Sequence, residues 1–283
     1  PYDTLFTIMK AALKKEPPSE VKTQSMAKSW AAMAAKRAAV APIPEGLEPP
    51  YAQVQGCLGD RLIDNLISGM DMSYRVLAKV AALKHRYPEL VHILLANHEL
   101  SQITGAGIVK DGIRVVEAFN QGVEYVFGSD TDAVLAAIGD FVRSMPLALR
   151  CLTPRGDILC THSLPTAAMM ARFDPTVISR DLTEADYQPR TGSAYIMVWG
   201  RKYDAELLED LVERWGVNLF ILGHERCDDG VLFIPPCAII LNSDHPRGVY
   251  LPIDLDNPPR AEDAAALVVP LNSGWRASGF DEA

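Results

Sequence analysis

The feature that most constrains this chain is a short apolar run that ends abruptly at polar side chains that can bind a metal or transfer a proton. Residues 91–95 (VHILL) form this run, which is long enough for one buried strand and too short for a helix. Asn97-His98-Glu99 follow almost at once. Open α/β sheets build their sites in this way, at the carboxyl ends of buried strands. An isolated Asn-His-Glu also suits an ordinary polar loop, so the other strand ends must decide.

The same pattern recurs along the chain. Four predicted strands lead to a carboxylate, an amide or an imidazole: residues 51–58 to Asp60, 91–95 to Asn97, 157–161 to His162 and 217–222 to His224. Amphipathic helices are predicted between them, at residues 72–86, 113–120, 130–143 and 204–215. This alternation predicts an α/β fold with a buried sheet. Carboxylate, amide and imidazole groups are the ligands of a hard or borderline divalent metal, so we predict that these side chains converge on one site.

Composition excludes several classes of function. With 48% hydrophobic and 22% charged residues in 283, the chain is globular. Its net charge of -9 argues against general nucleic-acid binding, which needs a basic face. No apolar run approaches the length of a membrane span, and no signal peptide is visible. The five cysteines are scattered and predict buried thiols in a reducing, cytoplasmic setting: Cys57, Cys151, Cys160, Cys227 and Cys237.

The chain divides into three predicted parts. Residues 1–50 form a helical segment with a Pro-rich connector, and their basic balance is typical of a solvated helical pair or of an arm that contacts a partner. Residues 51–258 form the α/β domain. Residues 259–283 form an acidic C-terminal tail that contains proline, for which we expect only loose attachment.

Four motifs in this order carry a resemblance to a known family: GD (59–60), ANHE (96–99), THSLP (161–165) and GHE (223–225). They resemble the calcineurin-like metallophosphoesterases, and within them the serine/threonine protein phosphatase (PPP) branch. The similarity also covers SMPLALR (144–150) and VWGR (198–201). It runs from about residue 51 to 255 and implies two mixed β-sheets packed as a sandwich, with helices outside.

The resemblance also implies roles for individual residues. Asp60 would bridge two divalent metal ions (Mn, Fe or Zn), and Asn97, His162 and His224 would be ligands of the second ion. His98 would be the general acid that protonates the leaving oxygen, with Asp64 holding its imidazole. This chemistry is consistent, because paired ions activate water and a histidine beside a carboxylate can donate a proton near neutral pH.

Three departures from the family pattern matter. GDRLIDN has one residue more between its aspartates than GDxxDRG, and Asn65 stands where the phosphate-gripping arginine is expected. Arg61 or Arg201 is a candidate replacement, since either can make a bidentate contact with phosphate. The GDxHG motif, which supplies the first metal's ligands, is not found, so only one metal site is complete in this chain. We expect this motif upstream of Pro1; the alternative is a degenerate first site.

Two classes of function follow. The first is a metal-dependent phosphoesterase, most simply a phosphoprotein phosphatase acting on a phosphorylated protein or a small phosphoester, with dinucleoside polyphosphate or nucleotide hydrolysis as the runner-up. The second is a binding protein of the same fold with an incomplete metal centre. Retention of imidazoles at three strand ends favours the enzyme. No nucleic acid or membrane is expected as a partner, and no pattern in the sequence indicates an oligomeric state.

Overall fold

The computed structural model describes residues 52–55, 71–110 and 113–271, without side chains for 52–55. The chain divides into two compact units. Within the described residues, the first comprises the segment up to His92 together with residues 107–144, and the second comprises residues 93–106 and 145–271. The boundaries predicted for residues 1–50, 51–258 and 259–283 stay a prediction.

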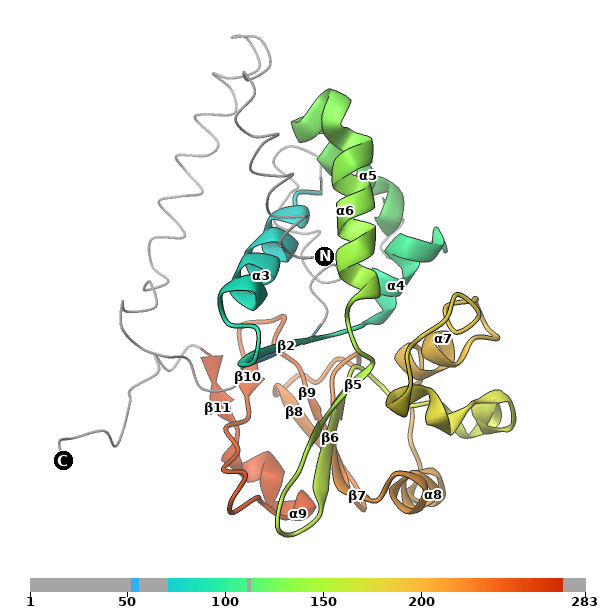
Figure 1. Ribbon diagram of the computed structural model, residues 1–283. Helices are drawn as coiled ribbons and strands as arrows, with labels where there is room; N and C mark the ends of the chain where they lie inside the picture. The colour runs from blue at the N-terminus through green and yellow to red at the C-terminus, as the bar shows by residue number, and fades with distance from the viewer. Residues whose placement is uncertain (1–51, 56–70, 111–112, 272–283) are drawn as a thin grey trace, which may run out of the picture. The chain divides into compact units, whose positions relative to one another are not determined.

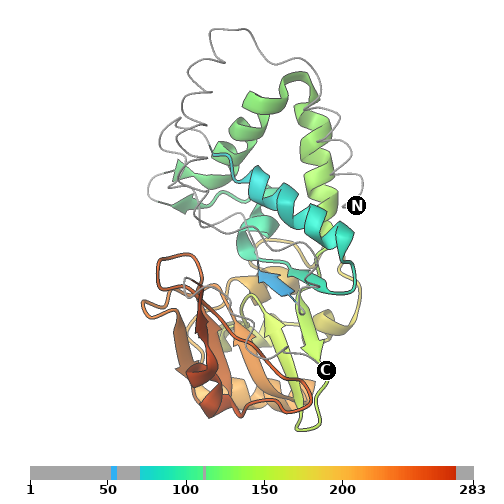
Figure 2. The same ribbon diagram turned by 90° about the vertical axis from the view of Figure 1, so that its left-hand side faces the viewer.

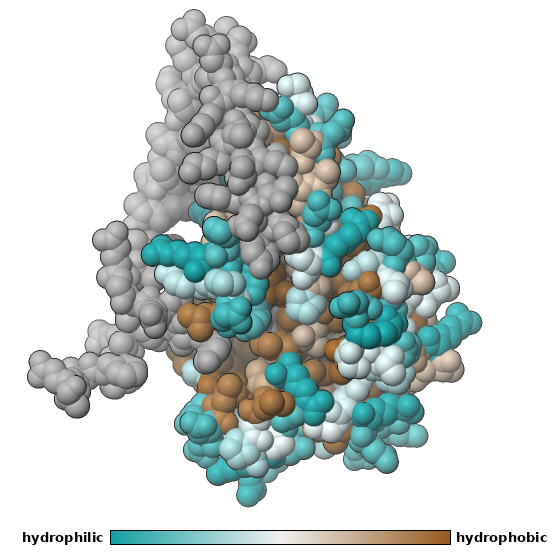
Figure 3. Space-filling model, viewed as in Figure 1, coloured by the Kyte–Doolittle hydropathy of each residue, from teal (hydrophilic) through white to brown (hydrophobic). Residues whose placement is uncertain are grey.

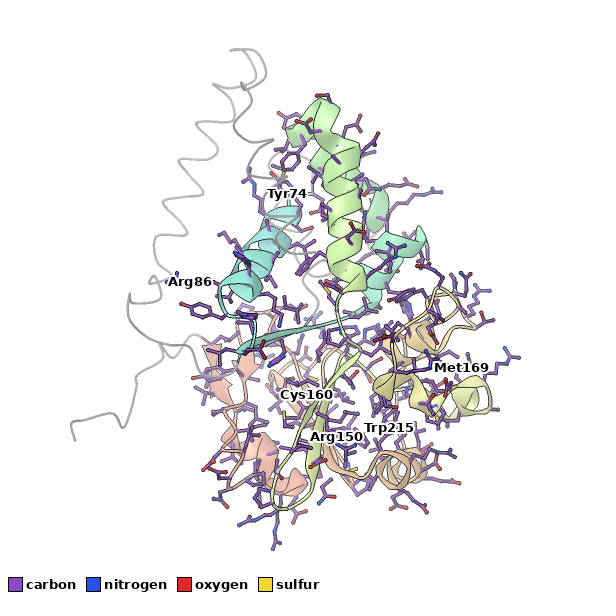
Figure 4. All side chains as sticks on the ribbon, viewed as in Figure 1. Tyr74, Arg86, Arg150, Cys160, Met169 and Trp215 are labelled. Carbon is purple, nitrogen blue, oxygen red and sulfur yellow. The ribbon has the colours of Figure 1, made fainter. Side chains whose placement is uncertain are left out.

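The first unit is mainly helical. Its elements are β1 (Ala52–Gln55), α3 (Tyr74–Arg86), the hairpin β3 (Val109–Lys110) and β4 (Ile113–Arg114), α5 (Val115–Phe127), η2 (Gly128–Asp130) and α6 (Thr131–Arg143). Tyr74 (Figure 4) packs edge to face on Phe127, with ring centroids 5.4 Å apart. Gly122 of α5 lies so close to the backbone of Asp71 that a Cβ there would be 1.6 Å from the Asp71 carbonyl oxygen. Only glycine permits this approach.

β2 (Val91–Leu94) pairs with β1 in a two-stranded sheet and carries the chain into the second unit. The elements that follow are α4 (Asn97–Thr104), β5 (Ala148–Cys151), β6 (Asp157–Thr161), η3 (Ala167–Arg172), η4 (Pro175–Ser179), α7 (Ser193–Val198), α8 (Ala205–Trp215), β7 (Val217–Leu222), β8 (Val231–Ile234), β9 (Ala238–Leu241), β10 (Val249–Tyr250), α9 (Ala261–Ala264), η5 (Ala265–Leu267) and β11 (Val269–Pro270).

A mixed five-stranded sheet forms the centre of the second unit, in the order β5-β6-β7-β9-β8 (Figure 1). β6, β7 and β9 are parallel, and the edge strands β5 and β8 are antiparallel to their neighbours. The α/β class with a mixed sheet flanked by helices is therefore confirmed. The further sheets among the described residues are two-stranded: β1 with β2, β3 with β4, and β10 with β11.

Both faces of this sheet are covered. On one face α8 buries Leu208 and Leu211, and Trp215 packs its ring 6.1 Å from that of Phe220 in β7. Figure 4 labels Trp215 beside Arg150, whose guanidinium donates to the carbonyl oxygen of Trp215 at 2.9 Å. This bond satisfies a carbonyl at the C-terminus of α8, where positive charge is also favourable.

The C-terminal segment covers the other face, where it is drawn in red in Figure 2. Ala264 of α9 is fully buried in a cluster with Leu94, Ile158 and Ile239. β11 pairs with β10, and the Leu271 amide donates to Gly248 O at 2.9 Å. The described part of the tail is therefore packed into the core, and the expectation of loose attachment is wrong for it. The small Ala264 fits against the sheet, whereas the neighbouring acidic side chains of Glu262 and Asp263 are exposed.

The remaining predictions from composition have mixed outcomes. Among the described cysteines, Cys160, Cys227 and Cys237 are buried thiols as expected, whereas Cys151 is half-buried. Cys57 lies outside the described residues. None of the helices in the described part of the chain is both long and apolar enough to cross a membrane. Polar residues in teal are interspersed with apolar residues in brown over the described surface in Figure 3, an ordinary mixture for a globular protein.

Candidate active site

Three strand ends of the second unit bring polar side chains together. β2 is followed by α4, which begins at Asn97 with Ala96 as its N-cap. β6 and β7 are parallel neighbours whose last residues, Thr161 and Leu222, are paired, so His162 and Gly223 stand at the same edge of the sheet. The amide of Gly223 donates to His162 O at 3.0 Å and extends this pairing by one step. His224 follows directly.

The side chains of Asn97, His162 and His224 converge. His162 Nε2 lies 2.9 Å from Asn97 Oδ1 and 2.8 Å from His224 Nδ1. The two imidazole rings meet edge to face, with centroids 4.6 Å apart. Asn97 is 3% exposed and His162 is 9% exposed, so both are buried, whereas His224 is half-buried. The predicted convergence of these three side chains is confirmed, while their role as metal ligands stays a prediction.

Both histidines are held neutral by their surroundings. Burial lowers the pKa of His162 well below its usual value, and the nearby charges of His224, His98 and Arg201 lower it further. Burial, followed by the charges of Arg201 and His98, lowers the pKa of His224 to about 3. Neutral imidazoles keep a lone pair on one ring nitrogen, which is the form that binds a metal.

Hydrogen bonding within the protein does not account for all the polar atoms of the cluster. A neutral ring carries one N–H, yet His162 Nε2 is within bonding distance of two other atoms at once. His224 Nε2 is buried and has no hydrogen-bond partner among the described residues. An unpaired buried nitrogen of this kind costs free energy unless a missing group completes the site.

Two separations between the donor atoms are compatible with an octahedral divalent cation. Two ligands bound at about 2.0–2.1 Å and at right angles to each other are roughly 2.9 Å apart, close to the 2.9 Å from His162 Nε2 to Asn97 Oδ1 and the 2.8 Å from His162 Nε2 to His224 Nδ1. Among the described residues, no group of three or more His, Cys, Asp or Glu side chains is arranged to hold a metal ion. The donor set among the described residues is therefore two imidazoles and one amide, and the predicted acidic ligand, Asp60, lies outside the described residues.

The other predicted site residues fall into two groups. His98 is the second residue of α4 and directly follows Asn97, and its charge lowers the pKa of both His162 and His224. Arg201 is exposed, with Nη1 3.5 Å from His224 O. Asp60, Asp64 and Arg61 all lie outside the described residues. Among the described residues, Asn97 and His224 both contact His162, and Arg201 lies against the backbone of His224.

The structure also reveals neighbours to which the sequence assigned no role. The ring of Trp199 meets His224 edge to face at 6.1 Å, and its buried Nε1 has no hydrogen-bond partner among the described residues. Glu225 accepts from the Lys202 amide at 3.3 Å. Trp199 and Glu225 lie inside the motifs VWGR and GHE, so their closeness in sequence to the predicted site residues could have identified them as neighbours of the site.

His245 does not belong to the cluster of Asn97, His162 and His224. Both its ring nitrogens form hydrogen bonds with the backbone, at Cys227 O and Arg247 N.

Comparison with known proteins gives limited similarity. No family model and no curated protein matches the sequence. Among solved structures, one similar protein is a serine/threonine phosphatase from Saccharomyces cerevisiae with similarity to human phosphatase PP5, at 16% identity and a TM-score of 0.43, covering 62% of this chain and 56% of that one. Another is the cold-active protein-tyrosine phosphatase of a psychrophilic Shewanella, at 14% identity and a TM-score of 0.40, covering 60% and 56%. These structural neighbours are phosphatases, and the chain spans little more than half the length of each.

Proposed function

We propose that this protein is a divalent-metal-dependent phosphoesterase that hydrolyses phosphomonoesters, most simply as a phosphoprotein (Ser/Thr) phosphatase. The observation that carries the proposal is that His162 Nε2 lies 2.9 Å from Asn97 Oδ1 and 2.8 Å from His224 Nδ1. A buried set of neutral donors at the ends of separate strands has little value for stability, because buried polar groups cost free energy unless they are paired.

Asn97, His162 and His224 would hold one ion, with Asp60 as the carboxylate that bridges to a second. When bound, the ions would supply Lewis-acid stabilisation of the phosphoryl oxygens and activation of the attacking water. The protein's part is to supply donors without charge. The amide and the two imidazoles leave the positive charge of the site uncompensated, and that charge favours an anionic phosphate.

His98 is the proposed general acid. Its place in the first turn of α4 sets it one residue from Asn97, so the helix that supplies a ligand also fixes the acid. In the proton transfer, the ring N–H of protonated His98 gives its proton to the leaving oxygen, with Asp64 proposed to orient the ring. Arg201 has a planar guanidinium able to grip two phosphate oxygens, a role for which Arg61 is the second candidate.

The test is hydrolysis by the full chain in Mn²⁺, with p-nitrophenyl phosphate, a phosphoserine peptide and a dinucleoside tetraphosphate as substrates. We expect wild type to hydrolyse the two monoesters slowly, and we expect His162→Gln to abolish this hydrolysis. Glu213→Ala, a change at an exposed glutamate of α8, is the matched control and should leave the rate unchanged.

Preferred cleavage of the dinucleoside tetraphosphate would favour the nucleotide-hydrolase alternative. Tight metal binding without hydrolysis of any substrate would favour a binding protein of this fold. Hydrolysis at the same rate by wild type and by His162→Gln would contradict the proposed site.

A further inference from the structure

Two non-glycine residues beside the candidate site have a left-handed backbone. His224 has φ +65° and Lys202 has φ +60°. The Glu225 amide donates to Gly223 O at 2.7 Å, which makes a three-residue turn with His224 at its centre. A positive φ in such a turn is the strained form, and strain of this kind persists only where the surroundings hold it. The contacts that hold these two residues therefore bear on the site.

Reciprocal contacts join the two strained segments. The Lys202 amide donates to Glu225 Oε1 at 3.3 Å, and Arg201 Nη1 reaches His224 O at 3.5 Å. Residues 201–202 and 224–225 are thus connected in both directions. Of the groups that make these contacts, the Glu225 side chain is neither a predicted metal ligand nor a predicted phosphate ligand.

The other end of the same loop is fixed to the segment that follows His162. The Tyr203 hydroxyl donates to Gly200 O at 2.9 Å and accepts from the Leu164 amide at 3.3 Å. Burial raises the pKa of Tyr203 to about 12, so this hydroxyl stays protonated and keeps its donor role. A Cβ on Gly200 would lie 1.5 Å from Leu164 O, which shows how closely the two backbones pack. The loop 200–203 therefore links the two histidine-bearing segments.

We propose that Glu225 is a positioning residue: by accepting from the Lys202 amide it fixes the loop 200–203 and so sets where the Arg201 guanidinium meets phosphate. This inference rests on the proposed function. Arg201 is exposed, so its own side chain has few contacts to hold it, and its position depends on the backbone on either side. The loop 200–203 is positioned by the acceptor oxygen of Glu225, and the negative charge of Glu225 is not required.

Two substitutions separate the oxygen from the charge. Glu225→Gln keeps a side-chain oxygen that accepts from the Lys202 amide, whereas Glu225→Ala removes it. One hydrogen bond of this kind corresponds to about a threefold to tenfold effect. In Glu225→Ala we expect KM for p-nitrophenyl phosphate to rise by about that factor with kcat within about twofold. Glu225→Gln should stay near wild type, as should the control Glu213→Ala.

Hydrogen–deuterium exchange in the folded full chain gives a readout that does not need activity. Peptides covering residues 200–203 should exchange faster in Glu225→Ala and at the wild-type rate in Glu225→Gln. Equal exchange in all proteins would overturn the proposal, and so would a Glu225→Gln variant that behaves like Glu225→Ala. If wild type is inactive but the exchange difference is present, the positioning role stands and the proposed function fails.

Discussion

Gly200→Ala is the sharpest perturbation that the structure offers near the candidate site. An ideal Cβ at this position would lie 1.5 Å from the Leu164 carbonyl oxygen, whereas real Cβ atoms essentially never approach closer than 3.0 Å. The two backbones must therefore separate by at least about 1.5 Å, the difference between these distances. The Tyr203 hydroxyl bonds to both of them and would lose one or both of its hydrogen bonds.

We expect this substitution to lower the free energy of unfolding by about 3 kcal/mol, toward the upper end of overpacking costs. For a domain of about 150–250 residues that corresponds to roughly 6–12 °C in melting temperature, measurable by circular dichroism. Gly107→Ala is the matched control, because no atom lies within 4 Å of its added Cβ. A Gly200→Ala protein that melts within about 2 °C of wild type would refute the inferred packing of the loop against Leu164.

Three further predictions concern single side chains. His98→Asn should keep metal affinity and slow hydrolysis by about 10²–10⁴-fold, mainly for poor leaving groups, as followed with aryl phosphates of graded leaving-group pKa; loss of metal binding would make His98 a ligand instead. Arg201→Lys should raise KM several-fold because an ammonium cannot grip two oxygens, and an unchanged KM would remove Arg201 from the phosphate site. The Arg180 guanidinium and then Thr183 hold the pKa of the Asp186 carboxyl below its usual value, so its stabilisation is full above about pH 4 and is lost as pH falls further. Asp186→Asn should therefore lower the free energy of unfolding, measured by urea denaturation, by about 1–2 kcal/mol at pH 7. A stability difference between wild type and Asp186→Asn that does not become smaller below about pH 4 would contradict this.

The strand ends could be predicted from sequence for a simple physical reason. Buried strands of a parallel sheet are continuous apolar runs, so the first polar residue after each run marks the carboxyl edge. His162 and His224 follow β6 and β7, which pair in parallel, and this pairing alone brings them to one edge. The convergence of Asn97 with them does not follow from this pairing, because β2 is not part of the five-stranded sheet.

The helix predicted at residues 113–120 shows where local signals mislead. The structure places the short strand β4 at Ile113–Arg114, and α5 then runs from Val115 to Phe127. A glycine such as Gly122 lowers the helical signal of a sequence. In the folded chain it lies in the middle of α5, because the backbone of Asp71 passes where a side chain would stand. This requirement comes from packing and leaves no trace in hydrophobic periodicity.

The contacts that support the site are also beyond sequence reasoning. Glu225 and Lys202 are distant in the chain, and their hydrogen bond depends on the left-handed backbone of Lys202 and His224. Lysine and histidine give no local signal for a positive φ, unlike glycine. Residues directly after a ligand position are thus identifiable as neighbours of the site, but what they contact has to be observed.

The measurement that tests the central claim most directly is Mn²⁺ affinity by isothermal titration calorimetry on wild type, Asn97→Asp and His162→Gln. We expect about one tight ion per wild-type chain, tighter binding by Asn97→Asp because a carboxylate replaces a neutral amide of the same shape, and at least about 100-fold weaker binding by His162→Gln. The gain in Asn97→Asp cannot arise from misfolding, which would only lose sites. Equal Mn²⁺ affinity in all three proteins would show that Asn97 and His162 do not bind the metal, and the account of the site would be wrong.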